Sequence, residues 1–339
     1  MPTVARIAVT TRPIFGPWGG GNQWLLQFSR YMHYAGYEVV HDLSGGADCV
    51  LIQHNGLTGK MSIGFDELAA WRAANPRGRV IHRINDNDVR KGTGKMDALM
   101  AKFNALTDHT VFISEWLRDH HAERWFDPAR PHSCILNGAD PSIFHPVGSK
   151  TWVHGKHGIN GNFPYPSASS VDEKAEPFRF VTHHWADNRM KGFDEYAALD
   201  SLIADGTLPN VELWIIGRWP ADITWKKART FAPCAGPALA DLLRQCHGYI
   251  TASRWEPGGM HFIEGAQCGL PLLFHEDGGG IPELARRYGV GFRDNLADAT
   301  KQFIANYTQH RNEVLTAPPS GDKMCLAYRE IVQRVLAER

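Results

Sequence analysis

Short runs of apolar residues alternate with amphipathic stretches along most of the chain. The run Ile7-Ala8-Val9 is followed by a glycine-rich turn, and residues 24–32 then place Trp, Leu, Phe, Tyr and Met side chains at helical spacing before Gly36 ends the segment. A buried strand followed by an amphipathic helix is the repeating unit of a parallel sheet, because right-handed crossovers join its strands. The pattern therefore predicts an α/β protein.

The same alternation predicts further elements in both halves of the chain. Strands are expected at 49–52, 80–81, 111–113 and 134–136, with a helix face over 96–106 and a helix capped by Ser114 and Glu115. The pattern restarts with strands at 178–181, 213–216, 249–250 and 272–274. Helices are expected from about residue 192, over 239–246 and over 325–336.

The length of 339 residues exceeds what one hydrophobic core usually serves, so two domains are expected. We assign residues 1–148 to an N-terminal domain and 178–319 to a C-terminal domain. Residues 149–177 are rich in Pro, Ser and Gly without apolar periodicity, which predicts a linker with a surface insertion. The terminal helix at about 320–339 is expected to pack back on the first domain.

The composition bears on which partners the protein binds and on the cell compartment in which it works. Lys plus Arg equals Asp plus Glu at 36 each, so no net charge attracts nucleic acid, and we expect no nucleic-acid partner. The six cysteines contain no C-x-x-C pair, and several stand in apolar runs, which favours buried free thiols in a reducing cytoplasm. No run of about 18 apolar residues predicts a membrane span.

The segment 253–272 is the densest in candidate chemistry. It follows a predicted strand, turns through Pro257, Gly258 and Gly259, and opens a helix. Glycines let backbone N–H groups approach a ligand closely, and a helix N-terminus favours phosphate. Glu256 precedes the turn, and Glu264 stands eight residues after Glu256, inside the predicted helix. This spacing suits two carboxylates that bind hydroxyls on either side of a diphosphate.

This segment resembles the donor site of the retaining glycosyltransferases of family 4. They have the GT-B fold, in which two Rossmann-like domains face each other across a deep cleft. By that resemblance Glu264 binds the ribose of a nucleotide sugar and Glu256 contacts the transferred sugar. The amides of Gly258, Gly259 and Met260 hold the sugar and phosphate. The following residues 269–271 and 278–283 also match the family pattern.

Other matches extend the resemblance over most of the chain. Residues 18–22, with Gly20 and Gly21, stand where the family has a glycine-rich loop facing the donor diphosphate, although any strand-to-helix turn can use glycine. Residues 137–146 resemble the end of the family's first domain, where a structural turn is the favoured interpretation. Lys191 before Gly192 matches a lysine that neutralises the leaving diphosphate, whereas a lysine at a helix start is otherwise merely solvated.

One position departs from the family pattern. The family usually has an arginine about six residues before the lysine, and this chain has Trp185 near that place. Arg189 is a candidate replacement, since a guanidinium forks onto phosphate oxygens. Arg189 pointing to solvent is an equally open interpretation.

Polar residues run off the end of the predicted strand at 80–81, where parallel sheets place ligands. His82 is a catalytic candidate by resemblance, and a packed, hydrogen-bonded histidine is the alternative. Arg83, Asn85 and Asp86 are acceptor-side candidates. Asp86 and Asp88 could suggest a metal, but no His or Cys ligands cluster near them in the sequence, and we predict no metal.

The resemblance implies a cytoplasmic hexosyltransferase that needs no cofactor. It would move sugar from a nucleoside diphosphate sugar, UDP favoured and GDP possible, to a hydroxyl of a glycan, lipid-linked or small-molecule acceptor. The alternatives are another GT-B enzyme, such as an inverting transferase or an epimerase, and a non-catalytic nucleotide-sugar-binding scaffold. Weak peripheral membrane contact could arise from a basic patch of Arg118, His120, His121 and Arg124, although a solvated helix face is the commoner origin of such a run. The oligomeric state is open.

Overall fold

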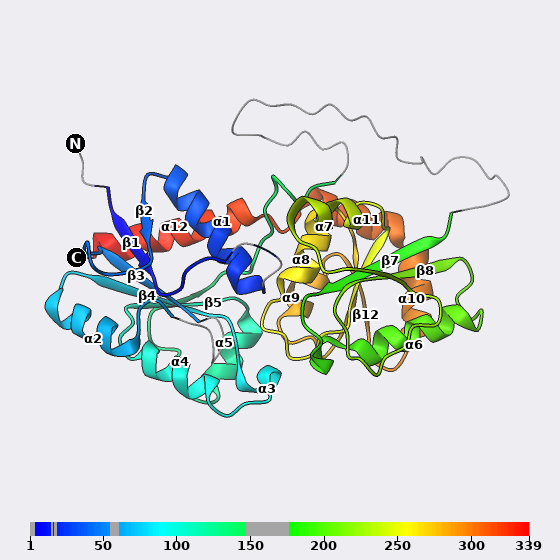
Figure 1. The fold of residues 1–339 in the computed structure, drawn as a ribbon, viewed down its shortest axis with the longest axis horizontal. Coiled ribbons are helices and arrows are strands. Elements are labelled where there is room, and N and C mark those ends of the chain that lie inside the picture. Colours follow the sequence, from blue (N-terminus) through cyan, green and yellow to red (C-terminus); the bar gives the residue numbers. More distant parts are fainter. Residues whose placement is uncertain (1–3, 15, 17–18, 55–60, 147–175, 339) are drawn as a thin grey trace. The chain divides into compact units, whose positions relative to one another are not determined.

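The computed structural model describes residues 4–14, 16, 19–54, 61–146 and 176–338. Contacts divide the chain into two compact units (Figure 1). The first unit contains residues 1–137, 255–259 and 321–339, and the second contains 138–254 and 260–320. Residues 149–175 of the expected insertion lie outside the described part of the chain.

The first unit is built on a sheet of six strands in the order β2-β1-β3-β4-β5-β6. Every pairing between neighbouring strands is parallel. The strands are β1 (Arg6–Val9), β2 (Glu38–Val40), β3 (Cys49–Gln53), β4 (Arg79–Ile84), β5 (His109–Phe112) and β6 (His132–Cys134). The helices are α1 (Gly20–Tyr34), α2 (Phe65–Ala74), α3 (Asp88–Lys91), α4 (Met96–Asn104), α5 (Glu115–Ala122) and α12 (Gly321–Ala337).

The second unit repeats this architecture with a parallel sheet in the order β12-β11-β10-β7-β8-β9. Its strands are β7 (Phe178–His184), β8 (Val211–Gly217), β9 (Arg229–Phe231), β10 (Gly248–Thr251), β11 (Leu272–His275) and β12 (Gly289–Phe292). Its helices are α6 (Phe193–Ala204), α7 (Gly236–Leu243), α8 (Met260–Gln267), α9 (Ile281–Ala285), α10 (Leu296–Ala305) and α11 (Tyr307–Thr316), with a 3₁₀ turn, η1 (Arg189–Lys191). The predicted fold class of two Rossmann-like domains is confirmed. Among the helices of the described residues, none combines the length and apolar character that crossing a membrane requires.

Each sheet of parallel strands is covered on both faces, which explains its continuous apolar runs. In the first unit, α1 and α12 pack on one face around Trp24, Phe28 and Tyr328 (Figure 1). The opposite face carries a second cluster that includes Trp71 of α2 and Phe103 of α4. The apolar positions that predicted helices at 24–32 and 96–106 are therefore core positions.

Several element boundaries differ from the expectation by a few residues; the helix predicted over 239–246, for example, is α7 at Gly236–Leu243. The strand predicted at 134–136 is β6 at His132–Cys134. The backbone N–H of Ile135 makes one more hydrogen bond, to the carbonyl oxygen of Phe112, but the strand has ended there. The terminal helix begins at Gly321, earlier than the predicted 325. The short edge strands β2 and β9 carry no long apolar run and escaped the hydropathy pattern.

Each sheet has a topological switch point, where consecutive connections leave toward opposite edges. In the first sheet, β1 lies between β2 and β3, and in the second, β7 lies between β8 and β10. Ligands of open parallel sheets bind beyond the carboxyl ends of the strands at such a point. The segments that follow β1, β3, β7 and β10 therefore stand where the fold favours a ligand.

Gly192 allows two of these segments to approach each other. It joins η1 to α6 with a left-handed φ of 80°, and a Cβ built there would lie 2.2 Å from the carbonyl oxygen of Ala252, just after β10. Gly206 has a similar φ of 84° with open space around its Cα. Comparing the two glycines therefore separates the cost of the left-handed backbone, which they share, from the cost of a steric clash, which only Gly192 would meet.

We expect Gly192→Ala to lower the free energy of unfolding by more than Gly206→Ala does. Gly206→Ala carries only the left-handed penalty of roughly 1–2 kcal/mol, whereas Gly192→Ala adds a backbone clash in the same unit. Urea unfolding followed by far-UV circular dichroism measures both. Equal losses in the two variants would show that the close approach at Ala252 does not constrain residue 192.

Candidate active site

A buried carboxylate lies at the switch point of the second unit. Glu264, on α8, is 6 % exposed, and its Oε2 lies 2.8 Å from Nε2 of His183, on β7. An ionised carboxylate only accepts hydrogen bonds, so His183 Nε2 must donate. The hydroxyl oxygen of Tyr249, on β10, accepts from the backbone N–H of His183 at 3.0 Å and lies 3.1 Å from its Nδ1. These contacts orient the predicted ribose-binding carboxylate from two adjacent strands.

Lys191 follows β7 at the same edge of the sheet. It is 9 % exposed and closes η1, which Asn188 caps by accepting from the N–H of Met190 at 2.8 Å. The carbonyl oxygen of Met190 accepts from the N–H of Arg254 at 2.9 Å, which ties η1 to the segment after β10. The predicted diphosphate lysine and Glu264 thus belong to segments that follow neighbouring strands.

The two arginines near Lys191 already have acidic partners. Arg189 is half-exposed, lies 2.9 Å from Asp194 and also contacts Asp222. Arg254 donates to Glu195 at 2.6 Å and lies 3.3 Å from Nε2 of His275. The proposed replacement of the family arginine by Arg189 stays a prediction, and a phosphate there would compete with two carboxylates.

The segment 255–259, which contains Glu256, Gly258 and Gly259, belongs to the first unit, and Met260 begins α8 in the second. The carbonyl oxygens of residues 255, 257 and 258 accept from Asn87 at 3.3 Å, Ser114 at 2.6 Å and Asn137 at 2.6 Å. Trp255 has a left-handed φ of 48°, which is strained for an aromatic residue. Ser114 also caps α5, as predicted, by accepting from the N–H of Leu117 at 3.1 Å.

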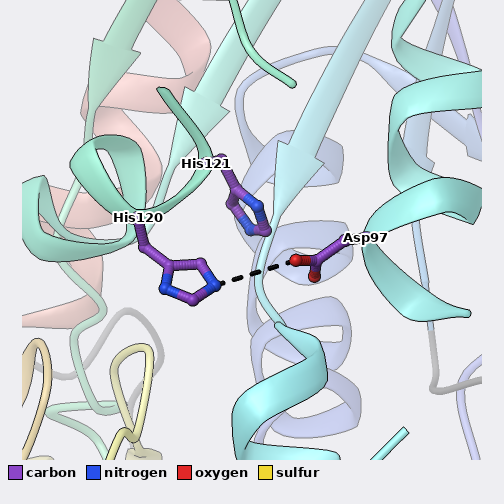
Figure 2. Close-up of side chains that lie close together, drawn as sticks. All are labelled: Asp97, His120 and His121. Carbon is purple, nitrogen blue, oxygen red and sulfur yellow. Dashed lines mark ion pairs between the residues drawn. The ribbon is translucent and has the colours of Figure 1, made fainter. Parts of the chain in front are cut away.

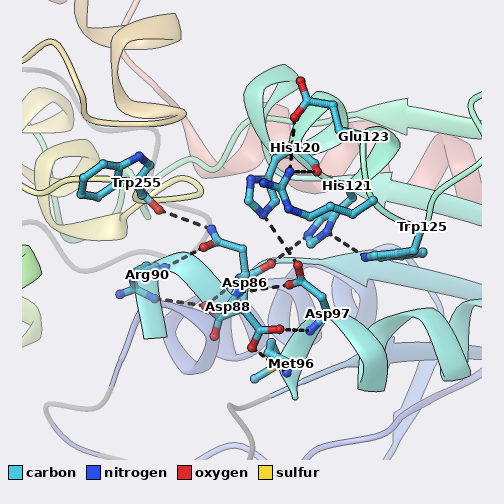
Figure 3. A network of polar contacts seen from close by, with 12 residues as sticks. Asp86, Asp88, Arg90, Met96, Asp97, His120, His121, Glu123, Trp125 and Trp255 are labelled. Carbon is cyan, nitrogen blue, oxygen red and sulfur yellow. Dashed lines mark hydrogen bonds and ion pairs between the residues drawn. The ribbon is translucent and has the colours of Figure 1, made fainter. Parts of the chain in front are cut away.

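Glu256 forms an ion pair that the sequence did not predict. Its Oε2 lies 3.0 Å from Nε of Arg90, on α3. Arg90 Nη1 also lies 3.5 Å from Asp86, as Figure 3 shows. Burial alone would lower the pKa of Arg90, but the carboxylates of Glu256 and Asp86 raise it. The carboxylates of Glu256 and Asp86 are 5 % and 4 % exposed, so solvent screens this cluster weakly.

Asp88 organises the loop that presents Arg90. Its carboxylate accepts from the backbone N–H of Lys95 at 3.0 Å. It also accepts from the N–H groups of Met96 and Asp97, at 2.8 and 3.1 Å, and Asp97 accepts in return from the N–H of Asp88 at 3.0 Å (Figure 3). Asp86 and Asp88 therefore have separate roles, one beside Arg90 and the other at the start of α4.

Asp97, His120 and His121 lie close enough to suggest a metal site, with ligand atoms within 4.8 Å of one another (Figure 2). Trp125 Nε1 donates to His121 Nδ1 at 2.9 Å, so the proton of the neutral ring is on Nε2, which donates to the carbonyl oxygen of Asp86 at 3.0 Å. His121 thus has no lone pair to offer in this arrangement. Asp97 and His120 alone fall short of the three protein ligands of a catalytic zinc site.

The other residues predicted in the first unit lie around the ends of β3 and β4. His82 is fully buried, with Nε2 3.0 Å from His54 and Nδ1 3.2 Å from Asn104. Arg83 donates to Asn137 at 2.9 Å and stacks 4.4 Å over the ring of Trp24, and burial lowers its pKa. Asn85 Nδ2 donates to the carbonyl oxygen of His54 at 3.3 Å.

The predicted glycine loop leads into α1, which begins at Gly20. The carbonyl oxygen of Gly21 accepts from Gln53 Nε2 at 2.6 Å, and Asn22 exchanges two hydrogen bonds with the backbone of Ile14, at 2.7 and 2.6 Å. Trp18 lies outside the described residues. The helix start is therefore fixed against β3 and the segment after β1, at the switch point of the first sheet.

The basic patch suggested on α5 is smaller than the sequence implied. His120 and His121 are buried at 8 % and 0 % exposure. Arg118 pairs with Asp119 at 2.8 Å and Arg124 with Glu123 at 3.3 Å. Of the four residues, only the two arginines therefore contribute positive charge to the surface. Membrane contact stays a prediction, but the patch of four residues does not support it.

Sequence reasoning missed several residues at these sites, among them His183, Tyr249 and Arg90. His183 stands at the carboxyl end of a predicted strand, so the rule that singled out residues 82–86 would also have found it. Arg90 stands four residues after Asp86, a spacing at which ion pairs are common. Tyr249 lies inside an apolar run and gives no polar signal of its own.

Burial of His121 predicts a pH dependence of stability. Burial lowers its pKa to about 4 in the folded protein. In the unfolded chain the same ring is protonated near pH 6.5, so acid favours unfolding. This contribution is complete above pH 6.5 and is lost as the pH falls toward 4. Between pH 7 and pH 5 it amounts to up to about 2 kcal/mol.

His121→Gln should therefore be less stable than the wild type at pH 7 but lose less further stability by pH 5. His33→Gln, which changes an exposed histidine, serves as the control and should keep the wild-type difference. Urea unfolding at the two pH values measures the effect. An unchanged pH difference in His121→Gln would contradict the assignment of a neutral buried ring.

No protein-family profile matches the chain, and no curated protein matches it. Solved structures of similar fold cover nearly its whole length. Sucrose-phosphate synthase from Thermosynechococcus elongatus aligns with a TM-score of 0.63 at 16 % identity over 99 % of both chains. A glycosyltransferase from Rickettsia africae gives 0.64 at 14 % identity over 99 % of both chains. HepE from Anabaena, solved with UDP-glucose, gives 0.64 at 11 % identity over 98 % of this chain and 100 % of that one. The chain thus has the GT-B fold.

Proposed function

We propose that this protein is a glycosyltransferase that uses a nucleoside diphosphate sugar as donor. The observation that carries the proposal is the placement of Lys191, His183 and Glu264 at the switch point of the second sheet. A buried cation and an oriented buried carboxylate follow neighbouring parallel strands there. A nucleoside diphosphate needs both, since its phosphates are anionic and its ribose offers a pair of hydroxyls.

Glu264 binds the ribose in this proposal. His183 engages Oε2 at 2.8 Å and orients the carboxylate. A carboxylate has lone pairs on both oxygens, so it can accept ribose hydroxyls while His183 still donates. Glu264 lies within α8 and Met260 at its start, where free backbone N–H groups favour the diphosphate.

Lys191 neutralises the charge that develops on the leaving diphosphate. A cation held in place before the reaction stabilises that charge most effectively where water is scarce, and Lys191 is 9 % exposed. Glu256 contacts the transferred sugar through its carboxylate, which Arg90 holds at 3.0 Å. Arg90 is thus a positioning residue for Glu256.

The reaction retains the anomeric configuration in this proposal. The departing phosphate oxygen takes the proton of the acceptor hydroxyl on the same face of the sugar, so no strong protein base is required. The geometry of His82 supports this mechanism, because both nitrogens of its buried ring already contact side chains. His82 therefore acts in positioning, in place of the catalytic role suggested by its sequence position.

The donor is UDP-hexose in this proposal, and the acceptor is a hydroxyl of a glycan, lipid-linked or small-molecule sugar in the cytoplasm. The structure of HepE with UDP-glucose supports uridine over guanosine.

UDP at 100 times its dissociation constant should raise the free energy of unfolding by about 2.7 kcal/mol, because it binds the folded state alone. Glu264→Gln keeps the size of the side chain but removes its charge and should weaken UDP binding about tenfold or more. Thermal shift and calorimetry with UDP, GDP, ADP and CMP measure both effects. Glu212→Gln, a half-exposed glutamate on β8, is the matched control. Absence of stabilisation by every nucleotide would overturn the donor-site assignment.

Lys191→Met should reduce the rate of sugar release from the donor by about 10²–10³-fold, because it removes a charge that acts most strongly in the transition state. Slow hydrolysis of UDP-glucose without acceptor, followed by UDP release, gives the rate. Lys227→Met, at an exposed lysine of the same unit, should leave the rate unchanged. A wild-type rate in Lys191→Met would remove Lys191 from the catalytic machinery.

A further inference from the structure

Several buried polar atoms without a hydrogen-bond partner lie beside the switch point of the first unit. Buried polar side chains are nearly always hydrogen-bonded in folded proteins, so such a group of atoms needs an explanation. They lie at the carboxyl end of β3, in the segments that follow β1, β3 and β4, or in a segment that pairs with one of these. The atoms are Thr11 Oγ1, Gln53 Oε1, His54 Nδ1, Ser62 Oγ and Asn85 Oδ1.

A chain of hydrogen bonds determines which of these atoms is a donor. Arg130 Nη1 lies 3.0 Å from Oδ1 of Asn104 and can only donate. The amide group of Asn104 therefore points the other way, toward Thr110 Oγ1 at 2.9 Å and His82 Nδ1 at 3.2 Å. His82 Nδ1 must accept, so the ring proton of neutral His82 is on Nε2.

The proton position of His82 determines the tautomer of His54. His82 Nε2 lies 3.0 Å from His54 Nε2 and donates to it, so the proton of the neutral His54 ring is on Nδ1. Both rings are neutral, because burial lowers the pKa of His54 to about 4 and that of His82 well below its usual value. His54 thus carries a buried N–H donor that has no acceptor among the described residues.

Asn85 supplies the complementary group. Its Nδ2 donates to the carbonyl oxygen of His54 at 3.3 Å, which leaves Oδ1 as a buried acceptor without a donor. An N–H donor and an amide oxygen on two hydrogen-bonded residues match a hydroxyl, which accepts one hydrogen bond and donates another. Phosphate fits less well, because burying its negative charge against two neutral groups costs far more than burying a hydroxyl.

We propose that His54 and Asn85 bind one hydroxyl of an uncharged sugar, and that the Arg130–Asn104–His82 chain holds His54 in the donor tautomer. The proposal deepens the function above, since this sugar is the acceptor of the transferase. Arg130, Asn104 and His82 are positioning residues, whereas His54 and Asn85 touch the ligand. The chain cannot carry a proton to or from the sugar, because it ends in an amide and a guanidinium that do not release one.

Ring nitrogen NMR of the protein labelled with ¹⁵N-histidine tests the tautomers at pH 7. Signals of His54 are assigned by their loss in His54→Leu. His54 should carry its proton on Nδ1 and His82 on Nε2. A His54 ring that is charged, or that carries its proton on Nε2, would overturn the proposal.

The same samples test the ligand. Glucose, galactose or mannose should move the His54 Nδ1 signal saturably, and inorganic phosphate should not. Failure of all three sugars, or an equal response to phosphate, would refute the assignment. UDP binding by the wild-type sample is measured alongside, so that intact UDP binding with no sugar response discards this site alone.

Two variants of residue 54 separate a ligand contact from a structural role. An asparagine amide can place an N–H near the position of Nδ1, so His54→Asn should retain affinity for the sugar within a few fold. His54→Leu fills the space without a donor and should weaken sugar binding by about tenfold, as loss of one hydrogen bond implies. Equal losses of affinity by calorimetry in both variants would contradict a hydrogen bond from residue 54.

Discussion

The candidate sites depend on one constraint, which is that a buried histidine ring nitrogen needs a hydrogen-bond partner of the correct polarity, from the protein or from a ligand. Groups that can only donate or only accept determine that polarity. The indole of Trp125 does so for His121, the guanidinium of Arg130 does so through Asn104 for His82, and the carboxylate of Glu264 does so for His183. The rings of His121 and His82 are thereby held in one tautomer, which makes them fixed hydrogen-bonding groups and poor proton shuttles.

This constraint agrees with the chemistry of a transferase whose leaving group accepts the proton. Such an enzyme needs groups that orient carboxylates and hydroxyls more than it needs a base. His183 orients Glu264, Arg90 holds Glu256 and His82 faces His54. A histidine that gained or lost a proton at one of these positions would exchange a donor for an acceptor and so weaken the hydrogen bond that orients its partner. The number of buried histidines is therefore understandable without a metal.

The architecture could be predicted from the sequence because strands that are buried on both faces of a parallel sheet consist of continuous runs of apolar residues. Cys49–Ile52 and Leu272–Phe274 are examples, and glycines mark turns such as the one at Gly192. The sequence predicted Glu264, Glu256 and Lys191 through a family resemblance. The residues that position the two carboxylates were harder to find, since Tyr249 lies in an apolar run and Arg90 stands in a charged turn. Pairing between segments more than 60 residues apart, as between His183 and Glu264, has no local signal.

The two units use the same place in their sheets for different polar groups. Beside β7, the second unit gathers charges, Lys191 and Glu264, which suit an anionic diphosphate and a ribose. Beside β1 and β3, the first unit gathers neutral groups, Gln53, His54 and Asn85, which suit hydroxyls. Burying a charge costs far more than burying a neutral dipole, so each buried charge needs a partner. On the proposed function, the diphosphate supplies the opposite charge for Lys191 and His183 supplies the hydrogen bond to Glu264. The neutral groups of the first unit would then face an acceptor that carries no charge.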